Sequence, residues 1–335
     1  MRTTANLLVT GGAGFIGSAF IRHLLREADF RGRILNFDAL TYAGNLSLLN
    51  GFHDHPRYRF VQGDILNQQL VEKLLLECEI DALVHFAAET HVDRSIASAL
   101  PFIETNVKGT LSLLEAVRSM PHIHFHHVST DEVYGSLGES GLFNEHSPYR
   151  PNSPYAASKA ASDHLVRAFA QTYGLSTTLS HSSNNYGPGQ HPEKFIPLMI
   201  HRCFEKRPLP VYGRGANVRD WLYVDDHAEA IWRILRYGKK GETYDVGGKG
   251  ELSNLELLHL LIDLIQIERP GDYRKLIRFV EDRPGHDFRY GLDISKIEFE
   301  LGWKPIVSLK DGLMRTIRWY FQNLSRSCTP LNLQA

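Results

Sequence analysis

Cysteine, net charge and long apolar runs are all scarce in this sequence. Its 335 residues include three cysteines, Cys78, Cys203 and Cys328, whose odd number and wide spacing favour free thiols in a reducing compartment over a disulfide framework. The 37 Lys and Arg residues nearly balance the 38 Asp and Glu residues, and a formal net charge of -1 gives no field to attract nucleic acid or an anionic membrane. We therefore expect a cytoplasmic protein with no nucleic-acid partner and no membrane partner.

No apolar run is long enough to suggest a targeting or membrane segment. The run LLVT at residues 7–10 gives way to glycines and is too short for a signal peptide or a membrane span. The longest later run, residues 255–267, carries Glu256, His259 and Asp263 at helical intervals. This spacing predicts an amphipathic helix.

The apolar residues follow an alternating pattern along the first half of the chain. Short runs predict strands, and the segments between them, with apolar residues every three or four positions, predict helices. The predicted strands cover residues 6–10, 32–37, 57–62, 81–87, 123–129 and 176–181, and the predicted helices cover residues 18–28, 68–77, 101–119 and 153–174. Such repeated βαβ units predict an α/β fold with a Rossmann-type doubly wound parallel sheet.

The pattern loosens after about residue 182, where stretches rich in Pro, Gly and charge indicate long functional loops. Residues 219–246 then show again the helix and strand patterns of the first half of the chain. We expect a first domain over residues 1–181, to which the chain returns at about 219–246. Residues 182–218 and 247–335 are expected to form a smaller, mixed α/β C-terminal lobe that binds the substrate.

A glycine-rich turn, TGGAGFIG, follows the first predicted strand. Gly12, Gly14 and Gly17 fit G-x-G-x-x-G, and Gly11, Gly14 and Gly17 equally fit G-x-x-G-x-x-G. Glycines allow the backbone to approach a pyrophosphate at the start of a helix. Asp38 ends the next predicted strand, where a carboxylate can bond to ribose hydroxyls and would repel a 2'-phosphate. The turn therefore predicts NAD as the cofactor of the first domain.

Two acidic positions leave alternatives open. Asp64 follows the third predicted strand, and its position fits an adenine contact and a helix N-cap equally well. Asp131 and Glu132 follow another apolar run, in VSTDEVYGS. They could be a solvated loop edge or two groups that give and take protons in one reaction.

A further motif lies at the start of the predicted helix 153–174. Ser153 is a plausible N-cap and Pro154 occupies the first helical position, while Tyr155 and Lys159 are four residues apart on one helix face. An ammonium near a phenol favours the phenolate and lowers the pKa of the tyrosine. Beside the glycine turn, this pair predicts removal of a proton from a substrate hydroxyl as NAD accepts a hydride.

The motifs TGGAGFIGS, HFAAETHVDRS, STDEVYG and YAASK together resemble the extended short-chain dehydrogenase/reductases. Within that class, the chain is similar to the dTDP-glucose 4,6-dehydratases almost from end to end. The similarity runs through LTYAGN, TNVKGT, NNYGP, HPEKFIP, LPVYGRGANVRDWLYVDDH and DRPGHDFRY.

The resemblance implies a closed redox cycle on dTDP-glucose. Tyr155, assisted by Lys159, would deprotonate the C4 hydroxyl as NAD accepts a hydride. Glu132 would remove the C5 proton, Asp131 would protonate the departing C6 hydroxyl, and Thr130 would bond at C4. Return of the hydride to C6 would give the 4-keto-6-deoxy sugar. Elimination needs a base and an acid on adjacent carbons, which explains the paired carboxylates.

The resemblance also implies two sets of binding residues and a homodimer. The implied NAD contacts, with the glycine turn, are Phe15, Ile16, Asp38, Ala39, Leu40, Thr41, Asp64, Ile65, Phe86, Ala87, Ala88, Thr105, Tyr155, Lys159 and Asn185. The implied substrate contacts are Thr90, Thr130, Asn184, Lys194, Phe195, Pro210, Val211, Tyr212, Arg219, Asn254, Arg283 and His286. Related enzymes pair two long helices, here around residues 102–117 and 156–173, across a two-fold axis, which implies a homodimer.

Departures from the family pattern fall on the substrate lobe. Ser182 stands where cysteine is common, Gly189 where an aromatic residue is usual, and Phe195 where leucine is usual. The alternatives are therefore the same reaction on a UDP- or other nucleotide-linked hexose, or a nucleotide-sugar 4-epimerase. A non-catalytic NAD-binding regulator would not need Tyr155, Lys159 and the acid pair.

The alternating histidines of HIHFHHVS could suggest a metal site. His122, His124 and His126 would share one strand face, but no carboxylate or cysteine nearby completes a ligand set. We expect histidines with hydrogen-bond partners and no metal.

Overall fold

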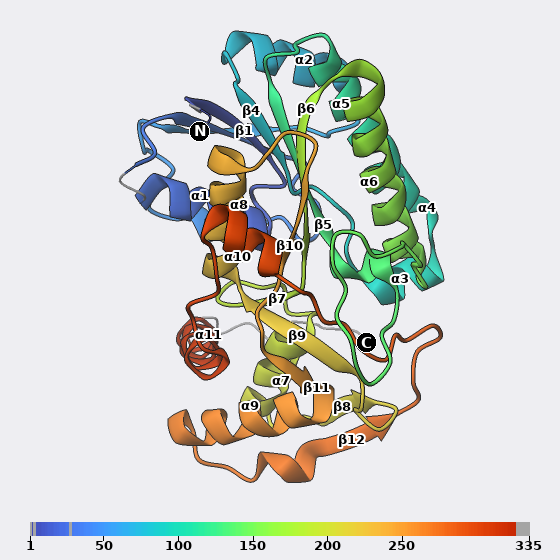
Figure 1. Cartoon of the computed structure of the whole chain (residues 1–335). Helices are drawn as coiled ribbons and strands as arrows, with labels where there is room; N and C mark the ends of the chain where they lie inside the picture. Colours follow the sequence, from blue (N-terminus) through green and yellow to red (C-terminus); the bar gives the residue numbers. More distant parts are fainter. Residues whose placement is uncertain (1, 3–4, 27–28, 326–335) are drawn as a thin grey trace.

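A seven-stranded parallel sheet forms the centre of the larger lobe (Figure 1). The computed structural model describes residues 2, 5–26 and 29–325, so Cys328 and its predicted free thiol lie outside the described residues. The spatial order of the strands is β10-β6-β5-β4-β1-β2-β3. Their bounds are β1 (Asn6–Thr10), β2 (Arg33–Asp38), β3 (Tyr58–Gln62), β4 (Ala82–His85), β5 (His124–Thr130), β6 (Ser176–Ser182) and β10 (Thr243–Val246). The predicted Rossmann-type sheet is confirmed.

Helices cover both faces of this sheet (Figure 1). One face packs on α1 (Phe15–Arg26) and α8 (Val224–Tyr237), and the other on α2 (Gln68–Glu77), α5 (Thr110–Arg118) and α6 (Pro154–Tyr173). Alternate residues of β1 show the division: Leu7 and Val9 belong to the first core, and Leu8 belongs to the second. Burial on both faces is why residues 7–9 of β1 and 82–84 of β4 are continuous apolar runs in the sequence.

Helix α6 begins and ends at the signals that its sequence contains. The Ser153 side chain caps it by accepting a hydrogen bond from the backbone N–H of Ala156, with Pro154 in the first turn, as predicted. The helix ends at Gly174, which has a left-handed φ of 70°. These caps fix the position of the Tyr155 and Lys159 side chains along the helix axis.

The predicted helix 101–119 contains a π-helical segment. It is built from α4 (Leu100–Phe102), the π-helical η2 (Ile103–Gly109) and α5. Within it, the buried Asn106 side chain bonds to the backbone N–H and carbonyl of Glu89 and to the hydroxyl of Ser158. A widened turn is common near functional sites, and here it ties the loop after β4 to helix α6.

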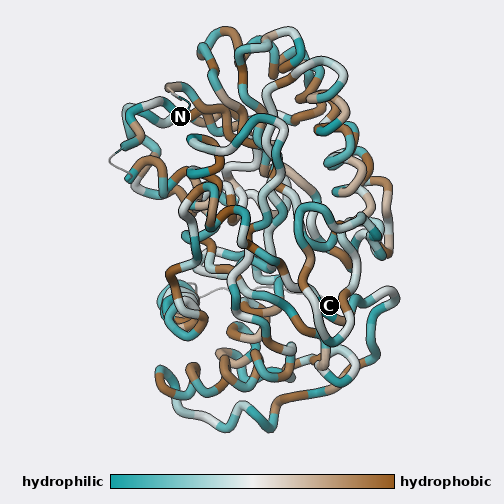
Figure 2. The backbone as a smooth tube through the Cα atoms, viewed as in Figure 1, coloured by the Kyte–Doolittle hydropathy of each residue, from teal (hydrophilic) through white to brown (hydrophobic). Residues whose placement is uncertain are grey.

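The smaller lobe has its own sheets and core. Strands β7 (Asn184–Tyr186), β9 (Val218–Tyr223) and β11 (Glu251–Ser253) form one sheet, and β8 (Leu209–Tyr212) pairs with β12 (Ile277–Val280). Helices α7 (Phe195–Phe204), α9 (Asn254–Glu268) and α11 (Leu309–Leu324) pack around its core. Figure 2 shows apolar and polar stretches alternating along these helices. Helix α9 buries Leu257, Leu261 and Ile265 and exposes Glu256 and Asp263, which confirms the amphipathic helix.

The chain passes between the lobes more than once. Strand β9 lies in the smaller sheet, whereas α8 packs on α1 and β10 extends the larger sheet beside β6. We propose the division into residues 1–181 and a C-terminal lobe, with the return to the first domain made chiefly by α8 and β10. The remaining elements are η1 (Leu46–Leu49), α3 (Val92–Ala97), η3 (Asp131–Tyr134), η4 (Tyr273–Leu276) and α10 (Ser295–Leu301). None of the helices in the described residues has the length and apolar content needed to cross a bilayer.

Candidate active site

The glycine turn after β1 is shaped by close backbone approaches. Gly11 has a φ of 70°, and a Cβ atom there would lie 2.6 Å from the backbone nitrogen of Ala87. A Cβ atom at Gly17 would lie 2.3 Å from the carbonyl oxygen of Gly11. A Cβ atom at Gly14 would meet that same oxygen at 3.1 Å and no other non-neighbouring atom of the described residues within 4 Å. The turn therefore leaves room at the start of α1, where helix amides favour an anion.

Asp38 links the end of β2 to this turn. Its carboxylate accepts hydrogen bonds from the backbone N–H of Ala13 at 2.9 Å and of Leu40 at 2.8 Å. Leu40 has a φ of 55°, a conformation that non-glycine residues rarely adopt. Each carboxylate oxygen has a further lone pair, so Asp38 retains the capacity to accept bonds from ribose hydroxyls.

The loops after β3 and β4 reach the same edge of the sheet. Asp64 accepts a hydrogen bond from the backbone N–H of Leu66, and Asn67 caps α2, so the helix N-cap alternative for Asp64 is wrong. Ile65 is buried and packs against the position of Gly109. Phe86, Ala87 and Ala88 follow β4, and Thr105 lies half-buried in η2. Carboxyl ends of parallel strands are where open α/β sheets bind ligands.

The acid pair lies at the end of β5, in the short helix η3. The Thr130 hydroxyl accepts a hydrogen bond from the backbone N–H of Glu132 at 3.3 Å and lies 3.4 Å from Asp131 Oδ1. Asp131 is 1% exposed, and its Oδ2 has no hydrogen-bond partner among the described residues. A buried carboxyl oxygen without a partner is not part of a solvated loop edge.

The two acids differ in their electrostatic surroundings. Burial, the charge of Glu132 and the charge of Asp220 raise the pKa of Asp131 well above its usual range. Burial also raises the pKa of Glu132, but the positive charges of Arg283, Arg219 and Lys194 oppose that rise. Asp131 is thus the group that holds a proton, and Glu132 is the one that cations help to ionise.

Tyr155 and Lys159 lie on one face of α6. Burial and the charge of Glu132 raise the pKa of Tyr155, and a hydrogen bond with Thr130 partly offsets the rise. Lys159 Nζ donates to the carbonyl oxygen of Val128 at 2.9 Å. Lys159 is not among the main causes of the shift at Tyr155, and its ammonium is directed at the backbone of β5, so the lowering of the Tyr155 pKa by Lys159 stays a prediction.

Four predicted residues lie in β7 or in the segment after it. Asn185 accepts a hydrogen bond from the ring of His227 at 2.8 Å, and Asn184 Oδ1 is buried with no partner among the described residues. Lys194 donates to the carbonyl oxygen of Thr90 at 2.9 Å, which brings two predicted substrate residues together. Phe195 begins helix α7.

Two arginines approach the acid pair from the smaller lobe. Arg219 is 5% exposed, donates to the carbonyl oxygens of Val218, Asp287 and Phe288, and lies with its guanidinium 4.2 Å from the ring centre of Tyr290. Arg283 is 3.4 Å from a carboxylate oxygen of Asp93. The positive charges of both arginines act on Glu132 of the acid pair.

The remaining predicted substrate residues differ in their exposure to solvent. The rings of Tyr212 and His286 meet edge to face with centres 6.1 Å apart, and Tyr212 is 40% exposed. Pro210 and Val211 belong to β8, and the Val211 side chain is buried in the core of the lobe. Asn254 begins α9, and its backbone N–H bonds to the carbonyl oxygen of Asn217.

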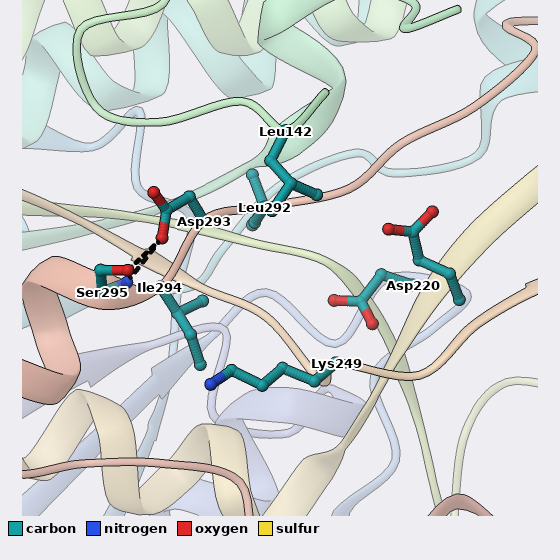
Figure 3. Close-up of a pocket in the computed structure, with 8 residues that line it drawn as sticks. Leu142, Asp220, Lys249, Leu292, Asp293, Ile294 and Ser295 are labelled. Atoms are coloured by element: carbon teal, nitrogen blue, oxygen red, sulfur yellow. Dashed lines mark hydrogen bonds between the residues drawn. The ribbon is translucent and has the colours of Figure 1, made fainter. Parts of the chain in front are cut away.

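Figure 3 shows a separate cavity, which has a volume of about 420 Å³. Its lining consists of Leu142, Asp220, Lys249, Glu251, Leu292, Asp293, Ile294 and Ser295, which include none of the predicted site residues. In Figure 3, a hydrogen bond joins Asp293 and Ser295 on one wall. One lining residue, Asp220, is linked to the predicted site, because its charge acts on Asp131.

Sequence reasoning missed a group of buried ionisable residues behind α6. Asp163, His127 and His181 lie in one cluster, and Asp163 is one helical turn after Lys159. The i, i+4 spacing of Lys159 and Asp163 was a readable signal. His127 lies on the opposite face of the strand from His124 and His126. The alternating pattern of those two histidines therefore does not point to it.

The histidines considered as metal ligands have other partners. His124 bonds to the hydroxyls of Ser176 and Thr178 at 2.9 Å, and His126 also bonds to Thr178. His122 lies in the exposed turn before β5. The prediction of hydrogen-bonded histidines on a strand face is confirmed for His124 and His126. No group of three or more possible ligands in the described ranges is arranged to hold a metal ion.

Comparison with known proteins gives consistent matches. The family model for GDP-mannose 4,6 dehydratase matches residues 8–316. A dTDP-glucose 4,6-dehydratase of Neisseria gonorrhoeae is 50% identical over 337 residues, covering 96% of this chain and 97% of that protein. The structure of a dTDP-glucose 4,6-dehydratase from Streptomyces venezuelae with NAD and TYD bound is 50% identical with a TM-score of 0.90, covering 96% of this chain and 98% of that one.

Enzymes of other specificity share the fold at lower identity. The UDP-glucose 4-epimerase of Thermotoga maritima, solved with UDP-glucose, is 28% identical with a TM-score of 0.86, covering 95% of this chain and 99% of that one. The fold, with a glycine turn and a Tyr-Lys helix at one edge of its sheet, is that of an extended short-chain dehydrogenase/reductase. The family is narrower than this class. The chain belongs to the dTDP-glucose 4,6-dehydratases.

Proposed function

We propose that this protein converts dTDP-glucose to dTDP-4-keto-6-deoxy-glucose, with NAD as a cofactor that is regenerated in each cycle. The observation that carries the proposal is the acid pair beside Tyr155 at the carboxyl edge of the sheet, in which Asp131 is buried and Glu132 is half-buried. Oxidation at C4 needs one proton acceptor, and elimination of water across C5 and C6 needs an acid and a base. The site contains all three groups.

The residues around the glycine turn fit a dinucleotide. The room at Gly14 and the close contacts at Gly11 and Gly17 accommodate a pyrophosphate against the start of α1. When bound, NAD accepts a hydride from the sugar and later returns it. The proposed contacts are those implied by the sequence: Phe15, Ile16, Asp38, Ala39, Leu40, Thr41, Asp64, Ile65, Phe86, Ala87, Ala88, Thr105, Tyr155, Lys159 and Asn185.

The electrostatic difference between the two acids supports a separate role for each. Asp131, whose pKa is raised well above its usual range, donates a proton to the departing C6 hydroxyl. Glu132, whose ionised form is supported by Arg283, Arg219 and Lys194, removes the C5 proton. Acid and base catalysis at neutral pH requires one carboxyl group that is protonated and a second one that can accept a proton. Asp131 and Glu132 have this arrangement.

Tyr155 takes the proton of the C4 hydroxyl. The Thr130 hydroxyl bonds to Tyr155 and thereby supports its phenolate, while burial and Glu132 oppose ionisation. A substrate that enters this site displaces water and brings its hydroxyl to the phenol. Lys159 supplies the positive charge on the same helix face.

The substrate lobe provides groups suited to a nucleoside diphosphate sugar. Arg219, Arg283 and Lys194 supply positive charge to a diphosphate, and Tyr212 with His286 offers ring surfaces to a base. The other proposed contacts are Thr90, Thr130, Asn184, Phe195, Pro210, Val211 and Asn254. The same reaction on a UDP-linked hexose is the second candidate. A 4-epimerase is disfavoured because epimerisation needs no elimination pair.

A homodimer in the cytoplasm completes the proposal. The apolar residues Ile96, Leu100, Ile103 and Leu111, on α3, α4, η2 and α5, are 37% to 66% exposed. A second copy of the chain would bury this surface. Light scattering at micromolar concentration tests the dimer, and a monomer would contradict it. Cys78 and Cys203 are free thiols, which suits a reducing compartment.

One incubation tests the reaction. Purified protein is mixed with dTDP-glucose or UDP-glucose in deuterated water, and the products are followed by NMR. A 6-deoxy-4-keto product with deuterium at C5 is the expected result with dTDP-glucose. An epimer, or no turnover of either hexose nucleotide, would overturn the proposal, and faster turnover of UDP-glucose would transfer it to the second substrate.

A further inference from the structure

Behind Tyr155 and Lys159 lies a cluster of buried polar groups to which the proposed reaction assigns no role. Ser129, His181 and Asp245 stand in register on β5, β6 and β10, at three neighbouring positions across the sheet. Asp163 of α6 faces this row from the helix side. Asp163, His181 and Asp245 are 0% exposed, so water does not stabilise these polar groups. They depend on one another and on hydrogen bonds instead.

Asp163 is the acceptor at the centre of the cluster. Its Oδ2 accepts hydrogen bonds from the hydroxyl of Ser129 at 2.9 Å, the hydroxyl of Tyr149 at 3.1 Å and Nε2 of His181 at 3.1 Å. Its Oδ1 lies 3.2 Å from Nε2 of His127. Burial would raise the pKa of Asp163, but the bonds from His127 and His181 hold it well below its usual range. The carboxylate is therefore ionised.

His127 lies between this carboxylate and Lys159. Its Nε2 lies 3.5 Å from Lys159 Nζ, and its Nδ1 has no partner among the described residues. With the proton on Nε2, the ring donates to Asp163 and leaves only a bare acceptor unpartnered, which costs less than a buried N–H without a partner. Burial and the charge of Lys159 lower the pKa of His127 to about 4, so the ring is neutral.

His181 lies between two carboxylates. Its Nδ1 is 3.0 Å from Asp245 and its Nε2 is 3.1 Å from Asp163. Burial would lower the pKa of His181, but these bonds raise it to about 9, so the ring carries a positive charge at neutral pH. Tyr134 of η3 donates to Asp245 at 2.9 Å, which ties the turn of the acid pair to the same cluster.

We propose that Asp163 is a positioning residue for the redox step: its negative charge, separated from Lys159 by Nε2 of His127, holds the Lys159 ammonium at the carbonyl of Val128, and His181 offsets part of that charge. This inference rests on the proposed function, in which Lys159 acts with Tyr155. Asp163 acts through Lys159 and the substrate does not contact it.

The charges around Lys159 favour this assignment. Burial lowers the pKa of Lys159 to about 8, and the negative charge of Asp163 opposes that fall. The titratable groups that face this region are His85 of β4, His127 of β5, Asp131, Glu132 and Tyr134 of η3, Tyr149 of the loop before α6, Tyr155 and Asp163 of α6, His181 of β6 and Asp245 of β10. The anion that supports the Lys159 charge is Asp163.

The test compares Asp163→Asn with His181→Asn in the full-length holoenzyme. Lysine labelled with ¹³C at Cε is incorporated, the Lys159 signal is assigned with Lys159→Arg, and its chemical shift is titrated with pH. Asp163→Asn removes the anion and should lower the Lys159 midpoint by about 1 pH unit, whereas His181→Asn removes the opposing cation and should raise it by a similar amount. Ser129→Ala, which loses a neutral donor to the same carboxylate, is the matched control and should leave the midpoint in place.

The pH profile of C4 oxidation provides the second readout. Its alkaline limb should move to lower pH in Asp163→Asn and to higher pH in His181→Asn. Shifts of the same sign in both variants, or no shift, would overturn the inference. If the cluster were only structural, the two substitutions would not shift the Lys159 midpoint in opposite directions. If Asp163→Asn does not fold, the inference is tested by His181→Asn alone, in which the Lys159 midpoint should rise. Opposite NMR shifts in a protein that does not turn over dTDP-glucose would overturn the proposed function alone.

Discussion

Asp220 of β9 and Asp131 of η3 are two buried carboxyl groups, and the charge of Asp220 raises the pKa of Asp131. The carboxylate of Asp220 accepts hydrogen bonds from the backbone N–H groups of Gly248 and Gly250, both at 2.7 Å. It also lines the cavity of Figure 3. A residue in the wall of one cavity thereby supports the protonated form of the acid that we propose for C6.

Replacing Asp220 with Asn should shift the pH dependence of elimination. Loss of the negative charge lowers the pKa of Asp131, so Asp131 loses its proton at a lower pH and the alkaline limb of product formation moves to lower pH. The measurement is the rate of 4-keto-6-deoxy product formation against pH. Asp293→Asn changes another acid of the same cavity and should leave the limb unchanged. An unmoved limb in Asp220→Asn would show that its charge does not reach Asp131.

Replacing Glu132 with Gln should separate oxidation from elimination. C4 oxidation by Tyr155 does not need Glu132, whereas removal of the C5 proton does, so dehydration should fall by about 10²- to 10⁴-fold. Reduced nicotinamide absorbance reports oxidation, and deuterium at C5 reports proton removal. Normal product formation would remove Glu132 from its proposed role, and loss of both signals would indicate a damaged site.

Replacing Gly17 with Ala should impair the cofactor turn. The new Cβ would lie 2.3 Å from the backbone oxygen of Gly11, and forcing the two apart should lower the free energy of unfolding by about 1 to 3 kcal/mol and weaken NAD binding. Urea unfolding and calorimetry with NAD measure the two effects. Gly138→Ala is the control, because a Cβ there meets no atom of the described residues within 4 Å, apart from its chain neighbours, and the backbone φ is not positive. Unchanged NAD affinity in Gly17→Ala would place the cofactor elsewhere.

The stabilising effect of His181 should depend on pH. The pKa of His181 is raised from 6.5 to about 9 in the folded protein, so its contribution to stability is complete below pH 6.5 and is lost as the pH rises through about 9. The difference in unfolding free energy between the unmutated protein and His181→Asn should therefore shrink between pH 6 and pH 9.5. Urea unfolding at several pH values measures it. A constant difference would mean that the ring is neutral throughout.

Local sequence signals were sufficient for the elements that position the site. The apolar run and glycines around β1, and the Ser153-Pro154 start of α6, act over a few residues and are visible in the sequence. The same holds for the acid pair, because Asp131 directly follows a strand whose carboxyl end must lie at the ligand edge.

Interactions between distant segments could not be predicted in the same way. The direction of the Lys159 ammonium depends on the Val128 carbonyl, 31 residues earlier, and on the registration of β5 with α6. The π-helical η2 depends on Asn106 reaching Glu89 and Ser158, and a three- or four-residue apolar spacing does not distinguish it from a regular helix. The pKa of Asp131 depends on Asp220, which lies on a strand of the other lobe.

Consecutive residues at the end of β5 make different contacts. This limits how the segment can change in length. His127 and Ser129 face Asp163, the carbonyl of Val128 receives Lys159, and Asp131 begins the acid turn. Side chains alternate between the two faces of a strand, so one inserted residue would send every following side chain to the opposite face. Substitutions can adjust this segment, whereas a single insertion or deletion would separate the redox groups from the elimination groups.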